Sequence, residues 1–148
     1  MFLLDFPLLA TEAAGSTGFQ WHTVAIALGV LSLATVAIYP FMKRFTYWPQ
    51  VFLGIAFNWG ALLGWAAVRG QVEWASVALY LGGISWTLAY DTIYAHQDIE
   101  DDALIGVKST ARLFGARTTL WLRGFLAATV TLMTLAVVGA LIDRIVLA

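Results

Sequence analysis

The 148-residue chain has no cysteine and little charge of either sign. The absence of cysteine excludes a disulfide scaffold, a thiol nucleophile and a thiolate-bound metal. Charged residues make up only 11% of the sequence, against about 25% in an average soluble domain. The net charge of −1 creates no basic field that would attract a polyanion, so we expect no nucleic-acid partner.

Hydrophobic residues are abundant instead, at 61% of the chain, and the mean hydropathy is +0.82. A helix needs about 20 apolar residues to cross the core of a bilayer. Four stretches carry no charge at all: 13–42, 45–68, 74–90 and 124–142. We therefore expect an all-α fold, a polytopic membrane helix bundle in which residues 1–148 form one domain. Its four transmembrane helices are predicted near 23–42, 50–69, 73–94 and 118–142.

The basic residues indicate the orientation of this bundle in the lipid bilayer. Most of them follow the first and third predicted helices, at Lys43, Arg44, Lys108, Arg112 and Arg117. The positive-inside rule places these two segments in the cytoplasm. No basic, serine-rich transit segment opens the chain, so we expect a bacterial inner membrane, with the mitochondrial inner membrane as the alternative.

Acidic residues are concentrated in one segment, since five of the nine fall between positions 91 and 102. Projected on a continuous helix at about 100° per residue, Asp91, Asp98 and Asp102 share one narrow stripe. Like charges on one stripe repel, and the repulsion is costly beside a membrane unless a cation neutralises it. Carboxylate oxygens suit Mg²⁺, which completes its shell with waters and substrate phosphates. The pattern predicts a magnesium site, and its alternative is a solvated acidic loop.

Basic residues on the same predicted membrane face are candidates for binding a metal-held diphosphate. Lys43 follows the first helix, whereas Lys108 and Arg112 follow the third and are spaced i,i+4, so they can share a helical face. Cations beside a metal-bound anion form the usual diphosphate clamp. The alternative for all three residues is that they only determine the membrane topology.

The second predicted helix carries one polar residue, Asn58, in the middle of its span. An intramembrane polar side chain should face the bundle, where it contacts either a polar substrate group or a neighbouring helix. Ala56, Gly60 and Gly64 form a stripe of small residues on the same helix. Such stripes favour close helix packing.

Three stretches together resemble the UbiA family of membrane prenyltransferases: YPFMKRFTYWPQ at 39–50, FNWGALLGW at 57–65 and YDTIYAHQDIEDDALIGVKSTARLFG at 90–115. The resemblance covers roughly residues 23–125 and is most specific in the third stretch, through its D-x₆-D-x₃-D spacing and K-S-T-A tail. It implies transfer of a polyprenyl group from polyprenyl diphosphate to the ring of 4-hydroxybenzoate in ubiquinone synthesis. The cofactor implied by the resemblance is Mg²⁺.

The resemblance also implies roles for the three aligned carboxylates. Asp98 and Asp102 match the acids of the family that hold Mg²⁺ and, through it, the diphosphate. Asp91 matches an acid at the end of the preceding helix, which completes that site or orients the aromatic substrate.

Basic and tyrosine residues match two further parts of the family pattern. Tyr39 and Lys43 match a Y-x-x-x-K pair whose lysine binds diphosphate. Lys108 and Arg112 fall in the matching K-S-T-x-x segment and are implied diphosphate ligands. The expectation that Asn58 contacts the aromatic substrate comes from its depth in the membrane and not from the family.

One part of the family pattern has no match in this chain. The family carries another acidic motif, N-D-x-x-D-x-x-x-D, whereas the single asparagine here, Asn58, is followed by Trp59. We therefore expect about four of the family's nine helices and only one of its two acidic motifs. The chain alone is then expected to be inactive and to need a complementary chain that supplies the other helices. The alternative is a non-catalytic, truncated helical bundle that acts as a scaffold.

Overall fold

The computed structural model describes residues 6–146 and, within them, the side chains of residues 26–143 and of Ile145. This part of the chain is helical without any strand, which confirms the predicted all-α bundle. The helices are α1 (Phe6–Phe45), α2 (Pro49–Phe57), α3 (Trp59–Arg69), α4 (Trp74–Ala95), α5 (Ile99–Leu104), α6 (Thr110–Phe114), the 3₁₀ turn η1 (Gly115–Arg117) and α7 (Thr118–Val146).

Three stretches among the described helices are long and apolar enough to cross a membrane: Ile26–Phe45, Pro49–Arg69 and Thr110–Asp143. They overlap three of the four predicted spans, and the second of them is interrupted at Asn58, between α2 and α3. The remaining predicted span corresponds to α4, whose 22 residues match the length of a span but which is not among these three stretches, so its crossing of the bilayer stays a prediction. The chain is thus a multi-pass membrane protein.

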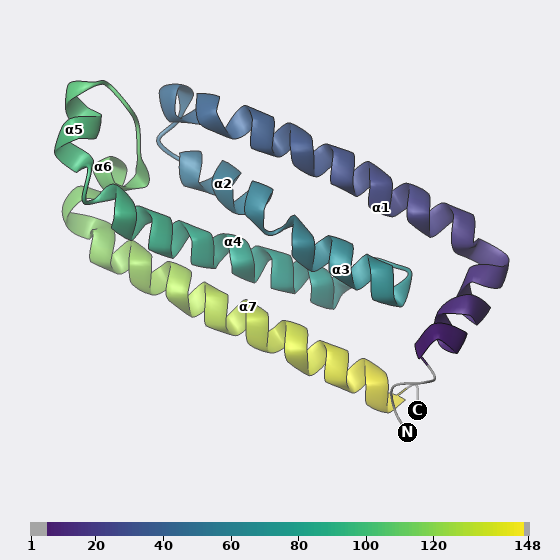
Figure 1. Cartoon of the computed structure of the whole chain (residues 1–148). Helices are drawn as coiled ribbons and strands as arrows, with labels where there is room; N and C mark the ends of the chain where they lie inside the picture. Colours follow the sequence, from purple (N-terminus) through teal and green to yellow (C-terminus); the bar gives the residue numbers. More distant parts are fainter. Residues whose placement is uncertain (1–5, 147–148) are drawn as a thin grey trace.

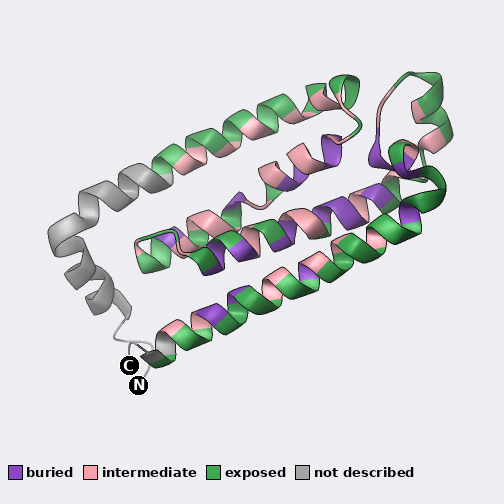
Figure 2. Ribbon diagram, turned by 180° about the vertical axis from the view of Figure 1, so that it is seen from behind, coloured by how far each residue is buried: buried purple, intermediate pink, exposed green. Residues whose placement is uncertain are grey.

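Helix α4 lies at the centre of the described bundle (Figure 1). It packs along α7 on one side and against α2 and α3 on the other, and α2 and α3 in turn separate it from α1. Its many buried residues contrast with α1, where no residue of Ile26–Phe45 is buried (Figure 2). The buried positions of the bundle therefore follow α4 and the helices that contact it.

Helix α4 lies close to its α2–α3 neighbours at Gly83. A Cβ atom added to Gly83 would collide with the side-chain amide of Asn58, so only glycine leaves room for that side chain. The close packing predicted at Gly60 and Gly64 is wrong, because a Cβ at either position would meet nothing within 4 Å. Both glycines instead line a cavity of about 560 Å³ between α3 and α7. The tight contact of this part of the bundle is therefore made by Asn58 and not by the two glycines.

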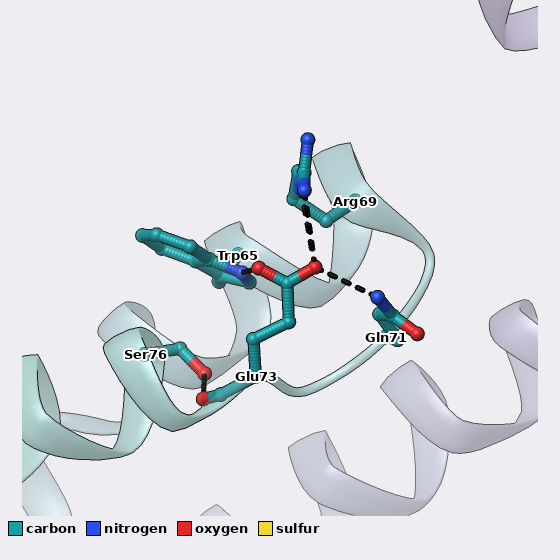
Figure 3. A network of polar contacts seen from close by, with 5 residues as sticks. All are labelled: Trp65, Arg69, Gln71, Glu73 and Ser76. Atoms are coloured by element: carbon teal, nitrogen blue, oxygen red, sulfur yellow. Dashed lines mark hydrogen bonds and ion pairs between the residues drawn. The ribbon is translucent and has the colours of Figure 1, made fainter. Parts of the chain in front are cut away.

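The hairpin between α3 and α4 lies at one end of the bundle (Figure 1), and Figure 3 shows its polar contacts. Helix α3 ends at Arg69 and is capped by Gly70, whose φ of 71° is the left-handed conformation that glycine adopts at low cost. The carboxylate of Glu73 accepts hydrogen bonds from Trp65 Nε1 at 3.1 Å, from Gln71 Nε2 at 2.7 Å and from Arg69 Nη2 at 3.2 Å. This carboxylate therefore stabilises the turn that leads into α4.

Aromatic packing holds the opposite end together. The ring of Phe114 stacks on Trp121 with centroids 4.7 Å apart, and Trp48 meets both rings edge-on at 5.3 and 5.9 Å. Trp48 lies in the α1–α2 loop, Phe114 on α6 and Trp121 on α7. The contacts fix α6 against the bundle and so position the segments on either side of it.

Candidate active site

The two basic segments predicted on one membrane face do lie at the same end of the bundle. The backbone N–H of Lys108 donates to the carbonyl of Lys43 at 3.0 Å, which joins the α5–α6 segment to the end of α1. Helices α5 and α6 lie at this end, beside the start of α2 (Figure 1). Residues far apart in the sequence, 39–50 and 90–112, therefore meet at one end of the bundle.

Polar side chains from three helices lie within electrostatic range of one another near the end of α4. We call Tyr39, Lys43, Gln50, Tyr90 and Asp91 the Asp91 cluster. The half-buried Asp91 carboxylate lies within electrostatic reach of the Lys43 ammonium and beside the amide of Gln50. Tyr39 lies close enough to interact with both Asp91 and Tyr90. The structure thus brings together the predicted residues Tyr39, Lys43 and Asp91.

The sequence did not single out Gln50, which is a member of this cluster. Its side chain is only 2% exposed, and its Oε1 accepts a hydrogen bond from the backbone N–H of Thr110 at 3.3 Å. The hydroxyls of Thr92 and Thr110, both fully buried, share a hydrogen bond of 2.6 Å. A glutamine inside a stretch otherwise apolar enough to cross a membrane was the signal that could have identified it.

The structure does not form the continuous carboxylate stripe predicted for Asp91, Asp98 and Asp102. Helix α4 ends at Ala95, a turn follows, and α5 begins only at Ile99, so the projection that aligned the three residues does not apply. The carboxylates of α5 remain one turn apart, because the Asp102 N–H donates to the Asp98 carbonyl at 2.8 Å. Asp98 precedes the first residue of α5, but its side chain makes no capping hydrogen bond.

The donor set at α5 fits a hard cation only in part. Within the described residues, no three acidic or histidine side chains lie close enough together to hold a metal ion. Asp98 is exposed and Asp102 half-exposed, and both offer carboxylate oxygens. Mg²⁺ is commonly bound by one or two carboxylates together with waters and substrate phosphates. The pair is therefore compatible with Mg²⁺ that shares its coordination with a diphosphate.

The two predicted diphosphate ligands after α5 are engaged with backbone carbonyls. Lys108 Nζ donates to the carbonyl of Phe45 at 3.2 Å and lies 5.4 Å from the ring centroid of Tyr47. Arg112 Nη1 donates to the carbonyl of Asp102 at 3.3 Å and also to that of Val107. Arg112 thus ties the end of α5 to the loop that follows it.

Asn58 makes the interhelical contact that was one of its two predicted environments. Its Nδ2 donates to the carbonyl of Gly54 at 2.8 Å and to Thr87 Oγ1 on α4 at 3.1 Å. These bonds satisfy the amide at the break between α2 and α3. A contact between Asn58 and an aromatic substrate stays a prediction.

The fold and the site together define a multi-pass helical membrane protein with acidic and basic side chains gathered at one end of an apolar bundle. The chain belongs to the UbiA prenyltransferase family, whose model matches residues 6–148. This result confirms the resemblance seen in the three sequence stretches.

Relatives of known name support a particular branch of this family. The chain is 60% identical to "4-hydroxybenzoate polyprenyltransferase, mitochondrial" of Aedes aegypti over 107 residues. These residues are 72% of the chain and 24% of the relative. The chain is 58% identical to the protein of the same name from Rattus norvegicus over 139 residues, which are 92% of the chain and 37% of the relative. It is 63% identical to the Bos taurus protein of that name over 102 residues, which are 68% of the chain and 28% of the relative.

The chain thus spans between about a quarter and rather more than a third of the length of these curated relatives. The relatives are named as mitochondrial proteins, which agrees with the mitochondrial alternative and not with the bacterial membrane that the sequence favoured. No solved structure matches the chain.

Proposed function

We propose that the chain supplies one acidic motif, and part of the bundle, of a 4-hydroxybenzoate polyprenyltransferase. The enzyme would transfer the polyprenyl group of polyprenyl diphosphate to the ring of 4-hydroxybenzoate in ubiquinone biosynthesis. The observation that carries the proposal is the convergence of the Asp91 cluster with α5 and α6 at one end of an apolar bundle. The names of the relatives support the choice of substrates.

Asp98 and Asp102 are the proposed Mg²⁺ ligands. Asp98 directly precedes α5 and Asp102 lies one turn further on, and within residues 26–143 their carboxylates hold neither a capping bond nor an ion pair, so both are available to a cation. Bound Mg²⁺ would neutralise negative charge that develops on a departing diphosphate. Lys43, on the last turn of α1, is the proposed diphosphate ligand of the protein itself. Lys108 and Arg112 are further candidates, which would first have to leave their carbonyl partners.

The transfer breaks one bond and forms another, and the proposed side chains assist these two steps. The C–O bond between the prenyl carbon and the diphosphate breaks, and the electron pair stays on the diphosphate. A ring carbon next to the phenolic hydroxyl then attacks the allylic cation, a C–C bond forms and the ring releases a proton. Asp91, held beside Lys43 and Tyr39, would orient the aromatic acid for this attack. The apolar helices would keep water from the cation.

The proposal has consequences for partners and location. Since the chain spans well under half of its relatives, a complementary chain carrying the family's other acidic motif is the proposed partner. The lipid bilayer surrounds the apolar helices. The names of the relatives favour a mitochondrial location, and the inner mitochondrial membrane is the proposed membrane. A scaffold without catalysis is the competing proposal, favoured by the apolar, unburied surface of α1.

Membranes containing the chain test the proposal directly. We would assay the transfer of a labelled polyprenyl diphosphate to 4-hydroxybenzoate with Mg²⁺, with the chain alone and with a second chain supplying the other helices. We expect activity only on complementation, and its loss in Asp98→Ala. The matched control is Asp101→Ala, which removes a neighbouring exposed carboxylate from the same helix.

Three outcomes separate the alternatives. Activity of the chain alone would show that one acidic motif suffices and would overturn the proposed partner. Equal loss in the Asp98 and Asp101 variants would overturn the assignment of the ligands. Absence of both transfer and Mg²⁺-dependent binding of a polyprenyl diphosphate analogue in complemented membranes would favour the scaffold.

A further inference from the structure

The segment between α4 and α6 carries three of the proposed ligand residues but has little packing of its own. We call residues 93–109 the ligand loop, since they include Asp98, Asp102 and Lys108. No residue of its helix α5 is buried, and α5 lies beyond the end of α4 (Figure 1). Because burial does not hold α5 in place, its position depends on how the two ends of the loop are fixed.

The two ends of the ligand loop meet at one buried hydrogen bond. Thr92 on α4 and Thr110, the first residue of α6, are 18 positions apart, and their hydroxyl oxygens lie 2.6 Å from each other. Both side chains are fully buried. Two apolar side chains of that size would pack there without the cost of burying hydroxyl groups. A directional bond between the hydroxyls, however, fixes one register of α6 on α4, which apolar packing alone leaves free.

Further hydrogen bonds connect this closure to the ligand residues. The backbone N–H of Lys108, two residues before Thr110, donates to the carbonyl of Lys43 at the end of α1 at 3.0 Å. Arg112, two residues after Thr110, donates through its guanidinium to the carbonyl of Asp102 on α5 at 3.3 Å. The placement of α6 on α4 therefore determines the positions of Lys108 on one side and of α5 on the other.

We propose that Thr92 and Thr110 are positioning residues of the active site, whose mutual hydrogen bond closes the ligand loop at its base. The bond thereby sets Asp98, Asp102 and Lys108 against the end of α4. This inference rests on the proposed function, because it takes these three side chains as ligands of Mg²⁺ and diphosphate. Since both threonine side chains are fully buried, they act through the ligands and not on the substrates themselves.

Three variants separate the hydrogen bond from simple packing. Thr92→Val keeps the shape of the side chain and removes its hydroxyl, whereas Thr92→Ser keeps the hydroxyl and removes only the methyl group. Thr92→Val combined with Thr110→Val replaces both partners by apolar groups of the same shape, so this double variant lacks the bond but should fold normally. The matched control is Thr129→Val, which removes a buried hydroxyl that donates to the Phe125 carbonyl of its own helix α7.

The first measurement needs no catalysis. We would measure hydrogen exchange of the backbone amides in the purified 148-residue chain in lipid nanodiscs. The reporters are the N–H groups of Lys108 and Thr110, which are hydrogen-bonded to α1 and to α2. We expect Thr92→Val and the double variant to speed their exchange by about tenfold, the scale of one hydrogen bond. Thr92→Ser and Thr129→Val should leave it unchanged.

The second measurement tests the role in transfer, in membranes complemented with the other helices. Both variants without the bond should raise the KM for polyprenyl diphosphate by about tenfold, and Thr92→Ser should keep the original value. The KM for 4-hydroxybenzoate should not change, because Asp91, the residue proposed to orient that acid, lies outside the ligand loop. A merely structural role would lower the amount of active enzyme, and with it the apparent kcat, without changing either KM.

The two measurements fail in different ways. Unchanged exchange in both variants that lack the bond would overturn the closure of the loop and with it the proposal. An unchanged KM for polyprenyl diphosphate in the double variant would overturn the positioning role even if exchange is faster. Absence of transfer by the unsubstituted chain in complemented membranes would instead overturn the proposed function. The exchange rates would still decide whether the two threonines close the loop.

Discussion

At the α3–α4 end of the bundle, the carboxylate of Glu73 accepts hydrogen bonds from three residues within eight positions of it in the sequence (Figure 3). It also forms the ion pair with Arg69, the only one recorded among residues 26–143. At the other end, the carboxylates of Asp98 and Asp102 have no such partner in that part of the chain, and the cations Lys108 and Arg112 donate to backbone carbonyls.

The difference indicates how the two ends use charge. A carboxylate that only closes a turn is neutralised by its sequence neighbours, which costs little conformational entropy because the donors are already close. The carboxylates of Asp98 and Asp102 form no ion pair within residues 26–143, although basic side chains lie at the same end of the bundle. They are therefore suited to a ligand that brings its own positive charge. The four predictions below test this contrast.

The largest effect is expected from removing charge at the two ends in turn. Asp98→Asn and Asp102→Asn should lower prenyl transfer in complemented membranes by about a hundredfold or more, the scale of losing a group that stabilises developing charge. Glu73→Gln should leave transfer unchanged and affect only stability. Initial rates with labelled polyprenyl diphosphate measure both. A Glu73→Gln chain as inactive as the α5 variants would break the contrast.

The second prediction concerns α4, which connects the two ends. In Gly83→Ala the added Cβ would collide with the Asn58 amide, so overpacking should destabilise the chain by about 1–3 kcal/mol. Gly60→Ala is the control, because a Cβ there would meet nothing within 4 Å. Thermal unfolding in nanodiscs compares the two. Equal midpoints for both variants would show that the Asn58 contact does not hold α4 in place.

The third prediction decides whether Arg112 holds the protein backbone or the diphosphate. Arg112→Ala removes the donors to the Asp102 and Val107 carbonyls and should raise the Mg²⁺ concentration for half-maximal transfer by about tenfold. Arg112→Lys should not restore it, because a single ammonium lacks the planar fork of a guanidinium. Full activity of Arg112→Lys at the original Mg²⁺ concentration would indicate a simple charge contact with the diphosphate instead.

The sequence predicted the elements of this site better than their geometry. Charge-free stretches and the family motifs identified the helices and residues such as Lys43, Asp98 and Asp91, because hydropathy and motif spacing are local properties. The end of α4 at Ala95 agrees with the predicted helix 73–94, but the separate helix α5, which takes Asp98 and Asp102 off the predicted stripe, was not predicted. Nor was the break at Asn58, where the amide bonds across to Thr87. Gln50 was missed although a glutamine in an apolar stretch was a sequence signal, because its partner, the backbone N–H of Thr110, becomes known only from the packing.

The smallest expected effect is the pH dependence of the Glu73 turn. The hydrogen bond from Gln71 is the main cause that lowers the pKa of Glu73, with Trp65 and Arg69 acting in the same direction against a partial desolvation. A carboxyl whose pKa is lower in the folded state stabilises the fold above its unfolded pKa of about 4.3, and this contribution disappears as the pH falls through the folded value.

Because the Arg69 side chain is 37% exposed, its ion pair with Glu73 should contribute less than about 1 kcal/mol. Glu73→Gln should therefore lower the unfolding midpoint slightly at pH 7, and the difference from the unsubstituted chain should vanish in acid. Asp101→Asn, which removes an exposed carboxylate at the other end, should leave the midpoint unchanged at pH 7. A larger loss in Asp101→Asn than in Glu73→Gln would mean that the acidic helix α5 also depends on its charges for folding, and the contrast between the two ends would fail.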